Sequence, residues 1–188
     1  MKLRRSIVLS CLAILATATP FTIPAADAQP SAAHSTGAPR AAAATHAGMT
    51  WSTAEQRPNG EVHVSYDSQT NGYQGDTPAT ASLPVLCLDI TGSAAPSDIT
   101  PGFYAGWSKG WVGLTPSVSG TSLTSRAAAD ALCARSFGTG WRMGEHHDGW
   151  YGPGLAYSGG WSFWANGAIP FGTRFWVAIN DQPANPWN

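Results

Sequence analysis

The feature that most constrains the fold is a capped helical segment within residues 123–148, LTSRAAADALCARSFGTGWRMGEHHD. Thr124 or Ser125 can begin the helix, because a side-chain oxygen at that position accepts a hydrogen bond from an unpaired N–H of the first turn. Alanine, the strongest helix former, dominates the segment. Gly138 stands where a helix commonly ends in a left-handed residue. The pattern predicts one main helix that carries Cys133.

The N-terminal residues have the pattern of an export signal. Residues 2–5 (KLRR) are mostly basic, residues 7–18 are apolar but too short to span a bilayer stably, and residues 26–28 (ADA) match a small-residue cleavage site. We therefore expect a signal peptide at residues 1–28, with cleavage before Gln29. No second apolar run is long enough for a membrane span, so we expect the mature protein to be secreted or periplasmic.

Export changes the interpretation of the cysteines. The sequence has three, and Cys11 lies inside the signal, which leaves Cys87 and Cys133. In an oxidising compartment two cysteines most simply form a disulfide, which for a loop of this length contributes about 4 kcal/mol in the chain-entropy model. The alternative is a pair of buried free thiols. Two thiols alone do not make a structural zinc site.

The charge of the chain argues against polyanionic partners. The formal net charge is −1, and removal of the signal makes it about −3. Nucleic acids and anionic membrane surfaces need a basic footprint on the protein, so we expect neither as a partner. The 9 tryptophans and 21 glycines instead indicate large, rigid apolar side chains in a loop-rich framework.

Composition divides the mature chain into a linker and a domain. Residues 29–50 are mostly Ala, Ser, Thr, Pro and His. Such a segment buries too little apolar surface to offset the entropy lost on ordering, so we expect a disordered linker. Residues 51–188 are then expected to form a single domain of ordinary size.

The first strand-like pattern of the domain is residues 61–67, EVHVSYD. Apolar and polar residues alternate there with the period of a half-buried strand. The alternation predicts that Val62, Val64 and Tyr66 face the core, and that His63 lies on the surface.

Later segments complete an α+β pattern. Residues 83–90 and 103–114 are expected to be strands, and residues 149–172 a long loop rich in glycine and aromatic residues. With the single helix, they predict a compact α+β domain with small antiparallel sheets and long Trp- and Gly-rich loops.

The last expected strand is apolar on both of its faces. Phe175, Val177 and Ile179 share one face, and Trp176 and Ala178 share the other, because alternate residues of a strand point the same way. A strand of this kind is covered by other elements on both sides. We therefore place Trp176 in the core.

The cysteine-bearing helix is followed by two characteristic runs, Gly-x-Gly-Trp-Arg-Met at residues 138–143 and Phe-Trp-Val-Ala-Ile-Asn-Asp at residues 175–181. The first is similar to the "GWR-hydrophobic" strand of the bacterial exported branch of the C-type-lectin-like superfold. The second is similar to the "WIGLND" core strand of its lectin branch. Residues 83–188 thus resemble this superfold, which implies a C-type-lectin-like domain with a secreted recognition role. Trp141 is then expected in the core.

The resemblance gives no clear metal site. Residues 182–185 (QPAN) are similar to the Gln/Glu-Pro-Asn ligand triplet of calcium-dependent lectins, with an extra alanine. A complete calcium ligand set is not evident, so no cofactor is expected.

The densest polar cluster is Glu145, His146, His147 and Asp148. Adjacent residues of a strand point to opposite faces, so at most two of the four converge without help from another segment. We expect these side chains to form hydrogen bonds within a turn closed by Gly149. The alternative is an exported hydrolase or metal-dependent enzyme that uses Glu145, His147 and Asp148.

Aromatic recognition fits the remaining pattern better than catalysis does. Exposed rings mark interaction sites and suit sugar faces or protein hot spots. The turn at residues 180–185 adds amide and carboxylate groups that prolines hold in place. The alternative is that the loop covers the sheet and its tryptophans belong to the core. The expected ligand-facing residues are Trp150, Tyr151, Tyr157, Trp161, Trp164, Asn180, Asp181, Gln182 and Asn185.

These observations favour an exported, non-catalytic binding module that recognises a glycan or protein ligand through a Trp-rich loop. The hydrolase or metal-dependent enzyme is the second candidate. A structural component of a larger surface assembly is the third.

Overall fold

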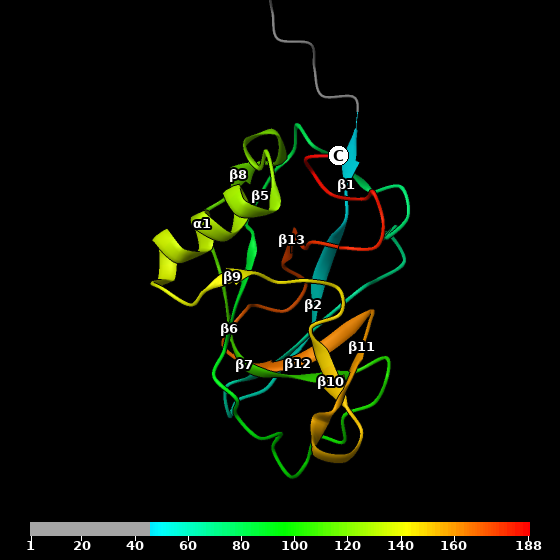
Figure 1. Cartoon of the computed structure of the whole chain (residues 1–188), viewed down its shortest axis with the longest axis vertical. Coiled ribbons are helices and arrows are strands. Elements are labelled where there is room, and N and C mark those ends of the chain that lie inside the picture. Colours follow the sequence, from blue (N-terminus) through cyan, green and yellow to red (C-terminus); the bar gives the residue numbers. More distant parts are fainter. Residues whose placement is uncertain (1–45) are drawn as a thin grey trace, which may run out of the picture. The chain divides into compact units, whose positions relative to one another are not determined.

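The computed structural model describes residues 46–188 (Figure 1). The expected signal peptide and residues 29–45 of the expected linker lie outside this range. The described residues form an α+β domain with one α-helix and mostly strand, which agrees with the expected fold class. No helix among them is long and apolar enough to cross a membrane.

The strands are β1 (Ala47–Gly48), β2 (Thr50–Gln56), β3 (Glu61–Ser65), β4 (Thr77–Pro78), β5 (Ser82–Leu83), β6 (Leu86–Ile90), β7 (Gly106–Leu114), β8 (Val118–Ser119), β9 (Arg142–Met143), β10 (Gly149–Tyr151), β11 (Tyr157–Gly159), β12 (Ser162–Asn166) and β13 (Arg174–Trp176). The helices are η1 (Gly120–Ser122), α1 (Arg126–Phe137) and η2 (Pro153–Leu155).

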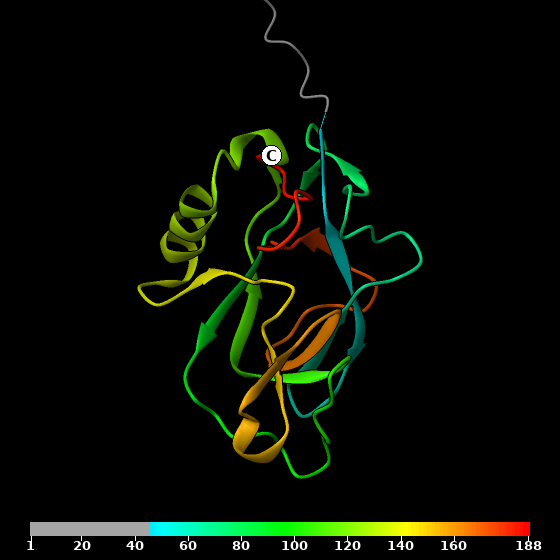
Figure 2. The same ribbon diagram turned by 45° about the vertical axis from the view of Figure 1, so that its right-hand side comes forward.

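Most strands belong to one nine-stranded sheet. Its order is β11-β10-β7-β12-β3-β2-β13, and β6 pairs with both β7 and β9. Strand β12 runs parallel to β7 and antiparallel to β3, so the middle of the sheet joins segments far apart in the sequence. Helix α1 packs beside β6 and β9 (Figures 1 and 2).

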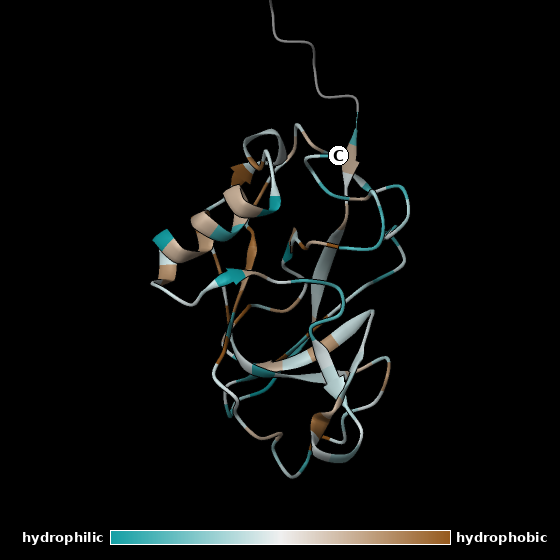
Figure 3. Ribbon diagram, in the orientation of Figure 1, coloured by the Kyte–Doolittle hydropathy of each residue, from teal (hydrophilic) through white to brown (hydrophobic). Residues whose placement is uncertain are grey.

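The helix begins and ends where the sequence predicts. The Ser125 hydroxyl accepts a hydrogen bond from the N–H of Ala128 at 3.1 Å, and Gly138 follows the last turn with a φ of 110°. Only Ala129 and Cys133 of the helix are buried. Its ribbon is mostly weakly hydrophobic with hydrophilic residues interspersed (Figure 3).

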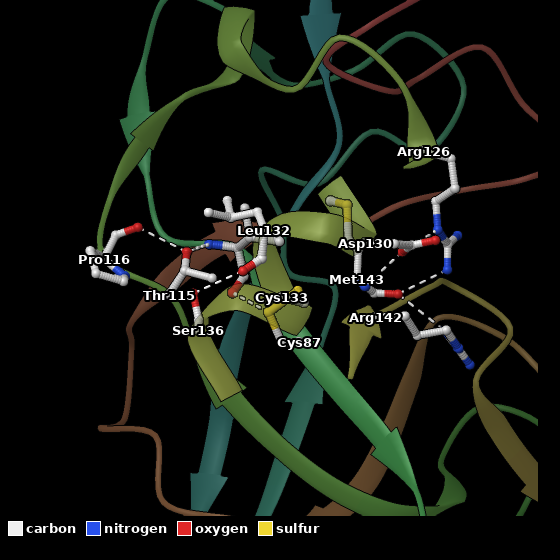
Figure 4. Close-up of a disulfide and its surroundings, with 11 residues drawn as sticks. Cys87, Thr115, Pro116, Arg126, Asp130, Leu132, Cys133, Ser136, Arg142 and Met143 are labelled. Carbon is white, nitrogen blue, oxygen red and sulfur yellow. Dashed lines mark hydrogen bonds and ion pairs between the residues drawn. A yellow bond between two sulfur atoms is a disulfide. The ribbon is translucent and has the colours of Figure 1, made fainter. Parts of the chain in front are cut away.

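A disulfide and a charged side chain hold the helix against the sheet (Figure 4). Cys87 of β6 is joined to Cys133 of α1, with Cα atoms 5.5 Å apart, which confirms the expected pair. Asp130 of α1 accepts a hydrogen bond from the Met143 N–H of β9 at 2.9 Å. Arg126 donates to both Asp130 and the Met143 carbonyl, each at 2.9 Å. The helix is thereby connected to two neighbouring strands.

Residues 175–179 separate two apolar clusters, as their alternation predicts. Phe175, Val177 and Ile179 belong to the larger cluster, together with residues of β2, β3, β6 and β12. Trp176 and Ala178 belong to the cluster beneath α1, and Trp176 is fully buried. Trp141, expected in the core, is only half-buried at the edge of this second cluster.

The ordered domain begins earlier than the sequence suggests. Residues 47–50 were assigned to the linker, but β1 pairs with β4, and Thr50 begins β2. Met49 is fully buried in the larger cluster, and Thr50 is equally buried against Asp76. Four residues assigned to the linker thus belong to the domain, because one buried methionine outweighs its small, polar neighbours.

The alternation of residues 61–67 is correct only in part. Val62 and Val64 are fully buried, as expected. Tyr66 is 48 % exposed, because β3 ends at Ser65 and the alternation stops with it. His63 is half-buried rather than on the surface, stacked on Trp164 with ring centroids 4.6 Å apart. It is covered because β3 lies inside the sheet, with β2 and β12 as neighbours.

Residues 149–172 are not a loop. They contain β10, η2, β11 and β12, and β12 is a central strand of the sheet. Some glycines in this segment permit close contact between strands, whereas Gly152, Gly154, Gly167 and Gly172 adopt the positive φ angles that glycine favours. A Cβ on Gly106 would lie 2.4 Å from the backbone of Gly149, and one on Gly159 would lie 2.1 Å from the Phe103 carbonyl oxygen.

Candidate functional site

A pocket of about 190 Å³ lies where five separate segments of the chain meet. Its lining combines aromatic rings with imidazole, amide and carboxylate groups. The lining residues are Gly72, Tyr73, Phe103, His146, His147, Gly160, Trp161, Ile179, Asp181 and Gln182. Three of the expected ligand-facing residues are among them, namely Trp161, Asp181 and Gln182.

Trp161 forms one wall of the pocket, at the connection between β11 and β12. Its backbone has a φ of 77°, and its ring contacts those of Tyr66, Tyr73 and His146 at centroid distances of 5.5, 6.3 and 4.8 Å. The neighbouring Gly160 lets the chain pass over His146, because a Cβ there would lie 2.5 Å from the imidazole. The ring is thus fixed in position before any ligand binds.

His146 lies at the base of this wall and is only 4 % exposed. Neither of its ring nitrogens has a hydrogen-bond partner among the described residues. Burial, together with charge repulsion from the neighbouring His147, lowers the pKa of His146 to about 4. At neutral pH the imidazole is therefore uncharged and offers the pocket one donor and one acceptor.

The side chains of Glu145 and Asp148 build a turn, as the simpler interpretation of the polar cluster expects. Glu145 accepts hydrogen bonds from the N–H groups of His147 and Asn180, at 2.7 and 3.0 Å, and from Nδ1 of His147 at 3.0 Å. Asp148 accepts two bonds from Arg142, at 2.8 and 2.5 Å, and one from the Glu145 N–H at 2.7 Å. Both carboxylates are buried and already accept hydrogen bonds from the protein. Few of their oxygen lone pairs are therefore free for the catalytic or metal-binding role that the enzyme alternative requires.

Through Glu145, the turn also positions His147 and Asp181. Nε2 of His147 lies 3.7 Å from the Asp181 carboxylate, whose side chain is 60 % exposed. Asp181 makes no closer polar contact among the described residues, which leaves its oxygens accessible at the mouth of the pocket.

The predicted turn at residues 180–185 is held together by Asn185. The buried Asn185 side chain accepts a hydrogen bond from the Ile179 N–H at 2.9 Å and donates one to the Ile179 carbonyl at 2.8 Å. It therefore stabilises the turn and does not face a ligand, contrary to expectation. Asn180 also points elsewhere, since its side-chain oxygen accepts from Arg126 at 3.3 Å.

The remaining expected aromatic residues do not line the pocket. Trp164 is 9 % exposed, between His63 and the guanidinium of Arg57, which is 4.1 Å from the ring centroid. The ring of Trp150 lies 3.8 Å from Nζ of Lys109. Both tryptophans were expected to face a ligand, but Trp164 is buried in the fold, Trp150 packs against Lys109, and neither lines the pocket.

Tyr151 and Tyr157 lie next to the pocket rather than in it. They face each other across the β10–β11 pair, and the ring of Tyr151 lies 5.9 Å from that of the pocket residue Phe103. Tyr157 is 57 % exposed and Phe103 47 %. Together with Tyr104, these rings form a surface that we call the aromatic ledge, consisting of Phe103, Tyr104, Tyr151 and Tyr157.

The sequence did not single out Tyr73, Phe103 or His146 as ligand-facing. Tyr73 follows the predicted Asn71–Gly72 turn, a signal of surface exposure, but nothing local indicates that it meets Trp161. Within residues 46–188 no three His, Cys, Asp or Glu side chains are arranged to hold a metal ion.

Comparison with known proteins gives no further guide to the site. No family model matches the chain, and no curated protein or solved structure compared with it is significantly similar.

Proposed function

We propose that this chain is an exported, non-catalytic binding module that holds part of a glycan in the pocket beside Trp161. The observation that carries the proposal is the placement of the Trp161 ring in one pocket with the side chains of Asp181 and Gln182. A flat apolar surface next to a few convergent polar groups suits a sugar ring, because its C–H face packs on the aromatic ring while its hydroxyls form hydrogen bonds.

The size of the pocket supports a glycan ligand of which only one sugar unit enters the pocket. Its volume of about 190 Å³ is below the roughly 300–1,000 Å³ typical of pockets that enclose a drug-sized molecule. The aromatic ledge continues from Phe103 outside the pocket and offers further rings for neighbouring units of a chain. A polymer with one unit in the pocket and others on the ledge fits this arrangement.

We also propose that the domain is C-type-lectin-like and exported. The proposal rests on the sequence runs at residues 138–143 and 175–181, and on the export-signal pattern of residues 1–28. The disulfide between Cys87 and Cys133 supports it, because such bonds persist in oxidising compartments.

The test is glycan binding by the mature chain and two tryptophan variants. A glycan array identifies candidate oligosaccharides, and titration calorimetry measures their affinity. Trp161→Ala should weaken binding at least about tenfold, because stacking on a central aromatic side chain carries much of the energy of such sites. Trp111→Ala is the matched control, since Trp111 is 51 % exposed on β7 but does not line the pocket.

Two outcomes would count against the proposal. One is unchanged affinity in a folded Trp161→Ala protein, because the pocket would then not be the site. The other is binding of no glycan on the array together with capture of a protein ligand, because the recognised class of molecule would then be different.

A further inference from the structure

The charged groups around the pocket indicate which kind of sugar unit it would bind. Asp181 is the only carboxylate in the lining, and the lining includes neither lysine nor arginine. The nearby arginines are engaged elsewhere, Arg142 with Asp148 and Arg126 with Asp130. A cation entering the pocket therefore meets an accessible carboxylate and no lysine or arginine side chain. Beside that carboxylate lies the imidazole of His147, whose Nε2 is 3.7 Å from Asp181.

The rings around the pocket favour a cation as well. The faces of aromatic rings carry partial negative charge and attract an ammonium group within about 6 Å of the ring centre. Trp161 and Tyr73 lie next to each other in the lining, with centroids 6.3 Å apart, and Phe103 lines the same space. This set of rings with one carboxylate is a typical receptor for an ammonium group.

His146 provides a second, independent indication of a polar ligand. It is 4 % exposed, lines the pocket and has no partner for either ring nitrogen among the described residues. A buried polar atom without a partner is costly, so a native structure normally satisfies it with a water or ligand atom. Because an uncharged imidazole accepts one hydrogen bond, His146 can receive an N–H of an ammonium group.

From this arrangement we infer that the pocket selects the ammonium group of an amino sugar. The inference rests on the proposed glycan-binding function and narrows it to glycans with free amino groups. The ammonium carries three N–H donors, and the pocket offers three acceptors, namely the Asp181 carboxylate, the Gln182 amide oxygen and an imidazole nitrogen of His146. The sugar rings that follow lie on the aromatic ledge.

The test compares three tetrasaccharides that share a β-1,4-linked backbone. They are the glucosamine tetramer, the N-acetylglucosamine tetramer and cellotetraose, titrated at low salt and about pH 6, where an amino group with an ordinary pKa is protonated. The glucosamine tetramer should bind at least about tenfold more tightly than the other two, because a hydrogen bond to a charged group is worth a factor of this size. Its affinity should fall as salt is added.

Two matched variants separate the carboxylate of the pocket from surface charge in general. Asp181→Asn should weaken the glucosamine tetramer about tenfold while changing cellotetraose binding little. Asp98→Asn should change neither, because Asp98 has the same side-chain exposure of 60 % but pairs with Arg57 outside the pocket.

The outcomes distinguish this inference from the function on which it rests. Equal binding of all three tetramers, abolished by Trp161→Ala, would leave glycan binding in place and overturn the selection of an ammonium group. Binding of none of them would refute the glycan function itself. Binding of a lysine amide in place of every sugar would overturn both, because the cation would then belong to a peptide.

Discussion

Replacement of His146 by phenylalanine should remove a large part of the acid sensitivity of this domain. Burial lowers the pKa of His146 from 6.5 to about 4. As the pH falls below 6.5, the unfolded chain takes up a proton at this position and the folded chain does not, so the folded state loses stability. The loss grows until the pH reaches the folded pKa. Each pKa unit corresponds to about 1.4 kcal/mol, which gives a loss of up to about 3 kcal/mol from this side chain.

Phenylalanine suits this position because the imidazole packs against rings and forms no hydrogen bond with another residue between 46 and 188. Its neighbours are Trp51, Trp161 and His147, with centroids at 5.7, 4.8 and 4.6 Å. At pH 7 the variant should be as stable as the wild type or more so, because two unpaired ring nitrogens are removed from the interior.

The assay is urea unfolding followed by tryptophan fluorescence, repeated at half-unit steps from about pH 7 to pH 4. The informative quantity is the difference in unfolding free energy between wild type and His146→Phe at each pH. Titratable groups present in both proteins contribute equally and cancel in this difference. They include His63, whose pKa is also lowered by burial. The difference should shift in favour of the variant by up to about 3 kcal/mol as the pH falls. Parallel curves would refute the reasoning, because His146 would then titrate alike in both states.

Three further predictions concern the framework. Replacing Cys87 and Cys133 by alanine should lower the unfolding free energy by about 4 kcal/mol, measured by urea unfolding, since the closed loop spans 46 residues; a loss below 1 kcal/mol would contradict this. Trp176→Ala should cost about 3–5 kcal/mol, because the side chain is fully buried, and a melting temperature within two degrees of wild type would show that the placement is wrong. Asn185→Ala should cost about 1–3 kcal/mol, since two buried groups of Ile179 lose their partner. It should also weaken glycan binding in calorimetry by loosening the turn, whereas unaltered affinity would separate the turn from the site.

The sequence predicts correctly those parts of the fold that depend on interactions between residues close together in the chain. The helix follows from the Ser125 cap, the run of alanines and Gly138, each of which acts within a few residues. The burial of residues 175–179 on two opposite faces follows from alternation alone, although β13 itself ends at Trp176. The expectation of export predicted the disulfide, because only two cysteines remain outside the expected signal.

The incorrect predictions arose where a pattern was extended beyond the element that produces it. Tyr66 continues the alternation of β3 in the sequence, but the strand has ended at Ser65, so its ring turns outward to Trp161. Glycines in residues 149–172 were interpreted as signs of a loop. In the sheet they allow backbones to approach each other, as at Gly149 and Gly159, and a sequence does not distinguish these two uses of glycine.

The site was found only in part because its parts come from distant segments. Trp161 and Asp181, both expected to face a ligand, line one pocket although they come from separate segments of the chain. Trp164, three residues after Trp161, lies within β12 and is buried, since the strand carries its side chain into a different cluster. Composition indicates that rings are abundant, but only topology determines which of them face solvent.

The position of the pocket follows from the same residues that make the domain stable. Residues 175–179, which comprise the end of β13 and the extended segment after it, are fixed on both faces by apolar packing, so the turn that follows starts from a rigid base. Asn185 closes that turn onto Ile179, and the Glu145 carboxylate accepts from the N–H of Asn180 at its beginning. Asp181 is then presented from a backbone held at both ends. A carboxylate positioned in this way would lose little entropy on binding the ammonium group that we propose as its ligand, and this is how a small pocket would discriminate by charge.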